Sequence, residues 1–371
     1  MTASLPRLVS KDDILAAVRN GIGIITLNRP RAMNALTLAM IRDITALLLA
    51  WCEDRAVKGV FVRGASAEGK GVAMCAGGDI RFFHRAALAG DPRLDDFFTE
   101  EYTLDHLVHT YPKPYVAWMD GVVMGGGMGI SQGAALRVVT ERTRMAMPET
   151  NIGLFPDVGA GYFLSRCPGR VGEYLALTGQ VIGAGDAIGW TLADGFIASN
   201  RLETFVAQIG AQRFDSDADW LRYARAYLED APPPQFAPEQ ARIDRHFAAP
   251  NLAAIFASLA RDESRWARAT LEAMRRRSPL MMAVTLEQIR RGRTMSFADN
   301  LRMERDLVRN CFALRPGAAS ETVEGIRALV IDKDASPRWN PATIEGVTDE
   351  MVRAHFVSPW PSYTHPLRAL C

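Results

Sequence analysis

The chain has 371 residues, of which 48% are hydrophobic and 23% charged, the balance of an ordinary globular protein. Its formal net charge of +1 provides no global field for nucleic acid or an anionic membrane surface, so neither is an expected partner. No apolar run reaches the length of about 18 residues that predicts a membrane span. Five scattered cysteines without a C-x-x-C pair favour a reducing compartment. Residues 1–6 do not resemble a secretory leader, so a cytoplasmic location is expected.

Short strands and amphipathic helices follow one another over the first 150 residues. Strands are predicted where apolar runs stand between turn residues, and an Asn-Gly pair joins the first two as a hairpin. They cover residues 14–18, 23–27, 57–63, 115–119, 136–140 and 144–147. Helices are predicted over residues 37–51, with Thr37 as N-cap, and over residues 97–110. The small residues of 69–78 predict a loop, and 121–133 a glycine-rich helix start. The rhythm is strand, strand, helix.

The second half of the chain changes character. Strand signals largely vanish after residue 200, residues 231–234 predict a proline-rich loop, and residues 251–330 read as helices rich in Ala, Leu, Arg and Glu. We therefore divide the chain into a core of residues 1–200 and a mostly helical region of residues 201–371 that packs on it.

Two glycine-rich segments follow predicted strands. In Cys75-Ala76-Gly77-Gly78-Asp79, small residues allow a ligand close to the backbone, and Asp79 can cap the next helix. In Gly125-Gly126-Gly127, each glycine costs roughly 0.5–1 kcal/mol relative to Ala, and the following helix presents unpaired N–H groups. Such donors stabilise a carbonyl oxygen that gains negative charge. A simple turn and close helix packing are the plainer explanations.

Two carboxylates stand in an apolar, turn-rich segment, Met147 to Gly159. Glu149 and Asp157 would be costly to bury there without a partner or a purpose. Desolvation would raise their pKa toward values useful for acid–base chemistry. The plainer alternative for each is a helix cap or a salt-bridged surface residue.

Other patterns lead to weaker hypotheses. The chain has neither the G-x-G-x-x-G of a dinucleotide site nor a phosphate-binding P-loop. Gly129-Ile130-Ser131-Gln132-Gly133 fits a serine-hydrolase elbow, but Ser131 falls inside a predicted helix. His106 and His109 lack a third metal ligand, so no metal site is predicted. Arg275-Arg276-Arg277 reads as a solvated helix face, with phosphate binding as the alternative.

The glycine segments together resemble the crotonase (enoyl-CoA hydratase/isomerase) superfamily. Met147-Pro148-Glu149-Thr150 with Gly153-Leu154-Phe155-Pro156-Asp157-Val158-Gly159 resembles its 3-hydroxyisobutyryl-CoA hydrolase branch. The resemblance covers the chain roughly from Ile22 to Phe356 and includes Thr285-Leu286-Glu287-Gln288, Arg291-Gly292-Arg293-Thr294, Glu324-Gly325-Ile326-Arg327-Ala328, Ile331-Asp332-Lys333-Asp334 and Trp339.

The resemblance implies an α/β fold, a crotonase-like spiral of repeated ββα units with a helical C-terminal region. It implies an oxyanion hole from the N–H groups of Gly78 and Gly126, and substrate-site carboxylates at Glu149, Asp157 and, from a Glu-Tyr pair, Glu101. Hydratases of the superfamily carry a first glutamate where this chain has Gly129. The relatives often form trimers, so a homo-oligomer is left open.

The expected reaction is hydrolysis of a short 3-hydroxyacyl-CoA, above all 3-hydroxyisobutyryl-CoA in valine degradation, without metal or redox cofactor. Glu149 is the expected catalytic carboxylate, as base or as nucleophile, and Asp157 would position the substrate hydroxyl or the water. Two rivals stay open: an enoyl-CoA hydratase or isomerase on the same fold, and a non-catalytic acyl-CoA-binding protein.

Overall fold

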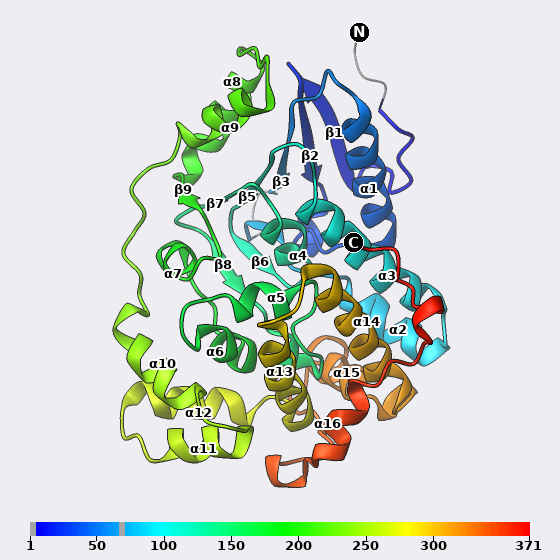
Figure 1. The fold of residues 1–371 in the computed structure, drawn as a ribbon, viewed down its shortest axis with the longest axis vertical. Coiled ribbons are helices and arrows are strands. Elements are labelled where there is room, and N and C mark those ends of the chain that lie inside the picture. The colour runs from blue at the N-terminus through cyan, green and yellow to red at the C-terminus, as the bar shows by residue number, and fades with distance from the viewer. Residues whose placement is uncertain (1–4, 67–70) are drawn as a thin grey trace. The chain divides into compact units, whose positions relative to one another are not determined.

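The computed structural model describes residues 5–66 and 71–371 (Figure 1). These residues form two compact units, each made of segments that alternate along the chain. Unit 1 comprises residues 1–78, 103–145 and 182–235, and unit 2 comprises residues 79–102, 146–181 and 236–371. The predicted boundary at residue 200 does not follow these units, because unit 1 continues to residue 235 and much of unit 2 precedes residue 200.

Unit 1 contains a six-stranded sheet in the order β1-β2-β3-β5-β7-β9. Its strands are β1 (Ile14–Arg19), β2 (Ile22–Leu27), β3 (Gly59–Gly64), β5 (Tyr115–Met119), β7 (Leu136–Val139) and β9 (Gly195–Phe196). The predicted hairpin is confirmed, since β1 and β2 pair antiparallel around Asn20 and Gly21, at φ 47° and 85°. Positive φ at both positions is what a tight two-residue turn requires. All other neighbours in this sheet pair in parallel.

A second, three-stranded sheet has the order β4-β6-β8, with β4 (Ala73–Cys75), β6 (Val122–Met124) and β8 (Arg144–Ala146). The sequence predicted a loop and a helix start where β4 and β6 lie, so both assignments are corrected here. Strands of three residues are too short to show an alternating pattern. Residues 69–70 of the predicted loop lie outside the described residues.

The chain visits the two sheets alternately. β3 is followed by β4 and α2 (Ile80–Ala89), β5 by β6 and α4 (Gly126–Gln132), and β7 by β8 and the short 3-10 helix η2 (Glu149–Ile152). In each round the first strand joins the large sheet and the second joins the small one. The predicted ββα repeat is therefore confirmed.

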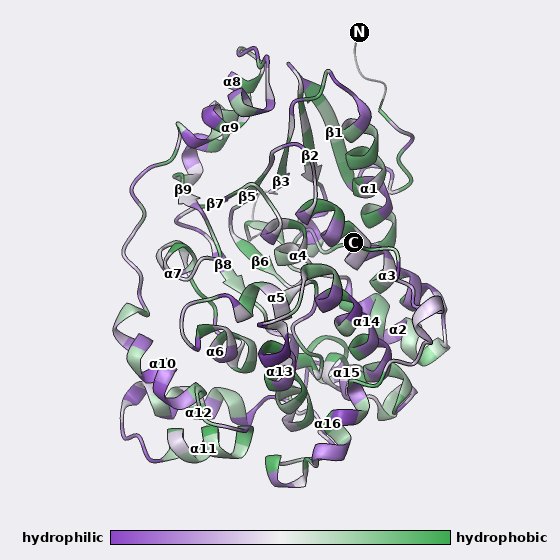
Figure 2. Cartoon of the chain, viewed as in Figure 1, coloured by the Kyte–Doolittle hydropathy of each residue, from purple (hydrophilic) through white to green (hydrophobic). Residues whose placement is uncertain are grey.

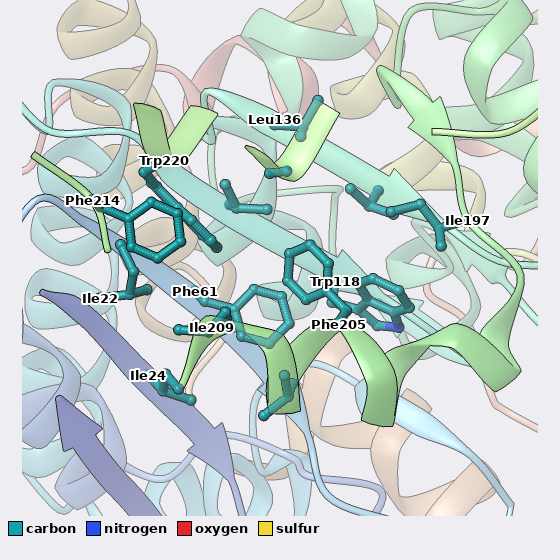
Figure 3. Close-up of a cluster of buried hydrophobic side chains, with 14 residues drawn as sticks. Ile22, Ile24, Phe61, Trp118, Leu136, Ile197, Phe205, Ile209, Phe214 and Trp220 are labelled. Atoms are coloured by element: carbon teal, nitrogen blue, oxygen red, sulfur yellow. The ribbon is translucent and has the colours of Figure 1, made fainter. Parts of the chain in front are cut away.

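The large sheet buries an aromatic cluster beneath α8 (Leu202–Ile209) and α9 (Asp217–Arg225). Figure 3 shows Phe61 and Trp118 of the sheet meeting Phe205 of α8. The Phe205 ring centroid lies 5.2 Å from that of Phe61 and 5.5 Å from that of Trp118, distances typical of favourable aromatic pairs. This burial explains why residues after 200 belong with the sheet. The remaining helices of unit 1 are α1 (Leu38–Glu53), capped by Thr37 as predicted, and α7 (Ala184–Gly189).

Unit 2 is mostly helical, and α3 (Arg93–His109) begins in it. Its other α-helices are α2, α5 (Ala160–Ser165), α6 (Val171–Thr178), α10 (Gln240–Phe247), α11 (Leu252–Ala260), α12 (Arg265–Arg275), α13 (Pro279–Gly292), α14 (Phe297–Ala313), α15 (Glu321–Ile326) and α16 (Asp349–His355). Several, such as α12 and α13, show both hydrophilic and hydrophobic residues in Figure 2, as amphipathic helices do. Within the part of the chain that the structure describes, the last strand ends at Phe196, and no helix is long and apolar enough to cross a membrane.

Candidate active site

The two glycine segments of unit 1 lie against each other at the ends of β4 and β6, which pair in parallel. Gly77 has φ 101°, and a Cβ placed on it would lie 3.5 Å from the backbone nitrogen of Gly126. A Cβ on Gly127 would lie only 2.3 Å from the carbonyl oxygen of Cys75. Close backbone approach therefore requires glycine at position 127, and the positive φ favours glycine at position 77, so the two segments are in contact.

The predicted oxyanion donors occupy this junction. α4 begins at Gly126, so the N–H of this residue precedes the intrahelical hydrogen bonds and carries positive dipole character. Gly78 forms an isolated parallel bridge with Leu36, whose N–H donates to the Gly77 oxygen at 2.8 Å. The segment before Gly78 is thus fixed by backbone bonding. The use of both N–H groups as an oxyanion hole stays a prediction.

The three predicted carboxylates all lie in unit 2 and are buried: the exposed fraction is 2% for Glu101, 7% for Glu149 and 5% for Asp157. The surface alternative for Glu149 and Asp157 is therefore wrong. Glu149 is the first residue of η2, directly after Pro148. Gly153, at φ 67°, ends this turn by donating its N–H to the backbone carbonyl oxygen of Glu149. The backbone hydrogen bonds of this turn therefore fix the main chain at Glu149, from which its side chain extends.

Asp157 is anchored by a residue that the sequence analysis did not assign to the site. The hydroxyl of Tyr102, a fully buried side chain, donates to Asp157 Oδ2 at 2.7 Å. Tyr102 follows Glu101 on α3, so a single turn of this helix carries both the Tyr102 hydroxyl and the Glu101 carboxyl group. The Glu-Tyr pair in the sequence was the signal that could have identified this donor.

Two carboxylate oxygens are left without a partner. Among the described residues, no hydrogen-bond partner is found for Glu101 Oε1 or for Glu149 Oε2, although both atoms are buried. A buried polar atom without a partner costs roughly 1–3 kcal/mol, and such atoms are retained where a ligand or ordered water completes them. These oxygens therefore mark where a polar ligand group can bind.

Burial raises the pKa of all three carboxyl groups, and charge repulsion adds to it for Glu101 and Glu149. Burial raises the pKa of Glu149, and the charge of Asp157 raises it further. Burial, then Asp157 and Glu149, raise the pKa of Glu101. Burial raises the pKa of Asp157 to about 6, against the opposing hydrogen bond from Tyr102. The groups thus form one electrostatic cluster of carboxyl groups with raised pKa, the kind of arrangement found where acid–base chemistry takes place.

The alternative nucleophile is excluded by its position. Ser131 lies inside α4, fully buried, and its hydroxyl donates to the Gly127 oxygen at 2.6 Å. A nucleophile elbow needs a strand that runs directly into an exposed serine. The elbow interpretation is therefore wrong.

The remaining patterns from the sequence are the histidine pair, His106 and His109, and the arginine run, Arg275-Arg276-Arg277. Within the described ranges, no group of three or more His, Cys, Asp or Glu side chains could hold a metal ion. Arg275, Arg276 and Arg277 line a cavity of about 690 Å³ in unit 2 together with Trp339. Arg277 also donates to the Thr178 oxygen at 2.6 Å, a structural contact. Phosphate binding at this cavity stays a prediction.

Comparison with known proteins assigns the family. The family described as enoyl-CoA hydratase/isomerase matches residues 22–356. A 3-hydroxyisobutyryl-CoA hydrolase, mitochondrial, from Gallus gallus is 40% identical over 92% of this chain and 88% of its own length. A probable 3-hydroxyisobutyryl-CoA hydrolase from Arabidopsis thaliana is 36% identical over 94% and 92%.

Solved structures agree on the fold and carry other names. A carnitinyl-CoA dehydratase from Mycobacterium thermoresistibile is 36% identical, with a TM-score of 0.84, over 94% of this chain and 98% of that chain. An enoyl-CoA hydratase from Rhodobacter sphaeroides, also 36% identical, has a TM-score of 0.83 over the same shares. The chain therefore belongs to the enoyl-CoA hydratase/isomerase family, in the branch of the relatives named 3-hydroxyisobutyryl-CoA hydrolase.

Proposed function

We propose that the protein hydrolyses the thioester of a short 3-hydroxyacyl-CoA, above all 3-hydroxyisobutyryl-CoA, to the free acid and CoA. The observation that carries the proposal is the buried cluster of Glu101, Glu149 and Asp157, in which two carboxylate oxygens lack a hydrogen-bond partner among the described residues. The names of the curated relatives support the same substrate for this chain. The step belongs to valine degradation, and coenzyme A enters as part of the substrate, without a further cofactor.

In this proposal, water oxygen forms a bond to the thioester carbonyl carbon, the carbon–sulfur bond breaks, and the CoA thiolate takes up a proton. Glu149 either removes the proton from water or attacks first and forms an anhydride that water then opens. The N–H groups of Gly78 and Gly126 are assigned to the developing oxyanion, where losing one donor typically costs about 2.7–4 kcal/mol. Asp157, and with it Glu101, is assigned to the substrate hydroxyl or the water.

A specific observation favours one rival, since two solved structures of 36% identity are named a dehydratase and a hydratase. Hydration in this family uses a pair of glutamates, as the resemblance implies. Here the first position is Gly129, which lies buried inside α4 and has no side chain. Only Glu149 of the pair is present, which favours hydrolysis.

The cellular setting in the proposal is the cytoplasm. The five cysteines are scattered along the sequence without a C-x-x-C pair, which supports a reducing compartment. The relative from Gallus gallus is named as a mitochondrial protein, and this name describes the chicken protein. A homo-oligomer stays a prediction of the family resemblance.

The test is release of CoA thiol from 3-hydroxyisobutyryl-CoA, followed with a thiol reagent, beside a panel of other acyl-CoA esters. Hydrolysis predicts thiol release that is fastest with short 3-hydroxyacyl groups. A hydratase instead consumes an enoyl-CoA, seen as loss of its conjugated absorbance, and frees no thiol. Binding of acyl-CoA without either signal would favour the non-catalytic rival and overturn the proposal.

A further inference from the structure

A fourth buried carboxylate lies beside the Asp157 turn and has no role in the chemistry described above. Glu304, on α14, is fully buried. Its Oε2 accepts the N–H of Gly159 at 2.7 Å, and its Oε1 accepts the N–H of Gly161 at 2.9 Å. Oε1 also accepts from Gln288 Nε2 at 3.0 Å and from Asn300 Nδ2 at 2.8 Å. Four donors converge on this one side chain, two from residues 159–161, one from α13 and one from α14 itself.

The amide side chains of Gln288 and Asn300 point their nitrogens at Glu304, and within the described part of the chain their own oxygens lack hydrogen bonds as a result. Among the described residues, Gln288 Oε1 and Asn300 Oδ1 are buried without a hydrogen-bond partner. Each amide therefore turns its nitrogen to Glu304 and leaves its own oxygen unpaired. A site built only of donors favours the ionised form of Glu304, because a carboxylate has no hydrogen to place among them, whereas burial opposes that form.

The turn that Glu304 holds is a strained one. Val158, a β-branched residue, has φ 55°, and the next residue, Gly159, has φ 89°. A left-handed conformation is unfavourable for a β-branched residue such as Val158 and persists only where the surroundings impose it. The bond from Gly159 N–H to Glu304 supplies such a constraint directly after Asp157.

The same network of hydrogen bonds also holds the residue before Asp157. Gln288 Nε2, besides contacting Glu304, donates to the Pro156 oxygen at 2.6 Å. The residues immediately before Asp157 and two places after it are therefore tied to one cluster on α13 and α14. Gly161 cannot be enlarged there, since a Cβ on it would lie 2.3 Å from Asn300 Oδ1.

From these contacts we propose that Glu304 is a positioning residue, which fixes the strained turn so that the Asp157 carboxylate stays on the Tyr102 hydroxyl and beside Glu149. Glu304 acts through the backbone and through no contact with substrate. The inference rests on the proposed function, because it assigns Glu304 a role in the reaction that Asp157 is proposed to serve.

The groups that sense Asp157 come from every element around it. They are Glu101 and Tyr102 on α3, Glu149 on η2, and Glu304 and Cys311 on α14. The pKa of Glu304 is raised to about 8, mainly by burial and to a smaller extent by the charge of Asp157, against the opposing hydrogen bonds from the turn N–H groups and Asn300. Displacement of Asp157 is therefore readable as a change in the pKa of Glu149.

The test replaces Glu304 by Gln, which keeps the volume and puts a donor where an acceptor stood. A misplacement of about 1 Å can cost 10²-fold in rate, so we expect kcat to fall by about 10²-fold. The acid limb of kcat against pH should move to lower pH, since a displaced Asp157 no longer raises the pKa of Glu149. Hydrogen–deuterium exchange of the peptide holding residues 153–162 should become faster.

The matched control is Glu173→Gln, which also removes a fully buried carboxylate but one that pairs with Arg170 and Arg293. It should lower the thermal midpoint and leave kcat and the acid limb of the folded protein unchanged. If Glu304→Gln fails to fold, Gln288→Met removes the bonds to Pro156 and Glu304 without a charge change and should shift both readouts in the same direction.

The outcomes separate the two proposals. Wild-type protein that releases no thiol refutes the proposed function, and with it the role in that reaction, while the exchange measurement still decides whether Glu304 holds the turn. Active wild-type protein whose Glu304→Gln variant matches Glu173→Gln in kcat and in acid limb overturns the positioning role.

Discussion

Asp157→Asn should make the protein more stable and less active at neutral pH. The side chain is 5% exposed and its pKa is raised from 3.8 to about 6, mainly by burial. A carboxyl group whose pKa is higher in the folded than in the unfolded state favours folding at low pH. That advantage is lost as pH rises through the folded value, because the unfolded chain ionises first.

The magnitude follows from the size of the shift. One pKa unit corresponds to about 1.36 kcal/mol, so ionised Asp157 costs the fold about 3 kcal/mol above about pH 6. Asparagine does not titrate, and its oxygen can still accept the Tyr102 hydroxyl. The variant should therefore gain up to about 3 kcal/mol relative to wild type at pH 7 and almost nothing near pH 4.

The assay is the thermal midpoint of both proteins across this pH range, with kcat for thiol release measured on the same samples. The difference in midpoint should grow between about pH 4 and pH 6 and stay constant above that. The acid limb of the residual activity should move to lower pH, because the charge of Asp157 raises the pKa of Glu149. An equal or lower midpoint for the variant at pH 7 would refute the view of Asp157 as a buried, incompletely compensated charge.

Three further substitutions test neighbouring claims. Glu149→Gln should fold normally and lose more than nine-tenths of its turnover, and thiol release above about a tenth of the wild-type rate would contradict its assigned role. Tyr102→Phe removes a hydrogen bond to the charged Asp157 carboxylate. The thermal midpoint should therefore drop by the equivalent of about 1.5–3 kcal/mol at pH 8, and by less near pH 4, where Asp157 is protonated. An equal drop in midpoint at both pH values would count against this bond. Gly127→Ala should prevent close approach of the two glycine segments and reduce both folded yield and turnover, whereas Gly189→Ala, with open space around its Cβ, is the neutral control for circular dichroism and activity.

Local chemistry in the sequence was sufficient for several elements. The Asn20-Gly21 pair defined the β1–β2 hairpin because Asn and Gly readily adopt the two positive φ values of a type I′ turn, which joins antiparallel strands through two residues. Thr37 and Asp79 were predicted as caps, and each accepts the N–H three residues on, from Met40 and Phe82. Signals of this kind act over a few residues, so they are legible without the fold.

The small sheet escaped prediction for the opposite reason. β4 and β6 have three residues each, and their pairing is decided by partners about 50 residues apart in the chain. Likewise, the helices after residue 200 looked like part of a separate region. Burial of Phe205 against Phe61 and Trp118, which no local pattern encodes, joins α8 to the sheet of unit 1.

The candidate site divides in the same way. The sequence by itself determined the residue types: glycines where backbones must touch, and Glu149 and Asp157 in an apolar segment where a charge is costly. Only the tertiary structure decided their environment, since burial, the Tyr102 hydroxyl and the Asp157 charge set the pKa values. Glu304 was invisible in the sequence because its bond to Gly159 spans 145 positions, and hydrogen bonds over such distances exist only once the chain has folded.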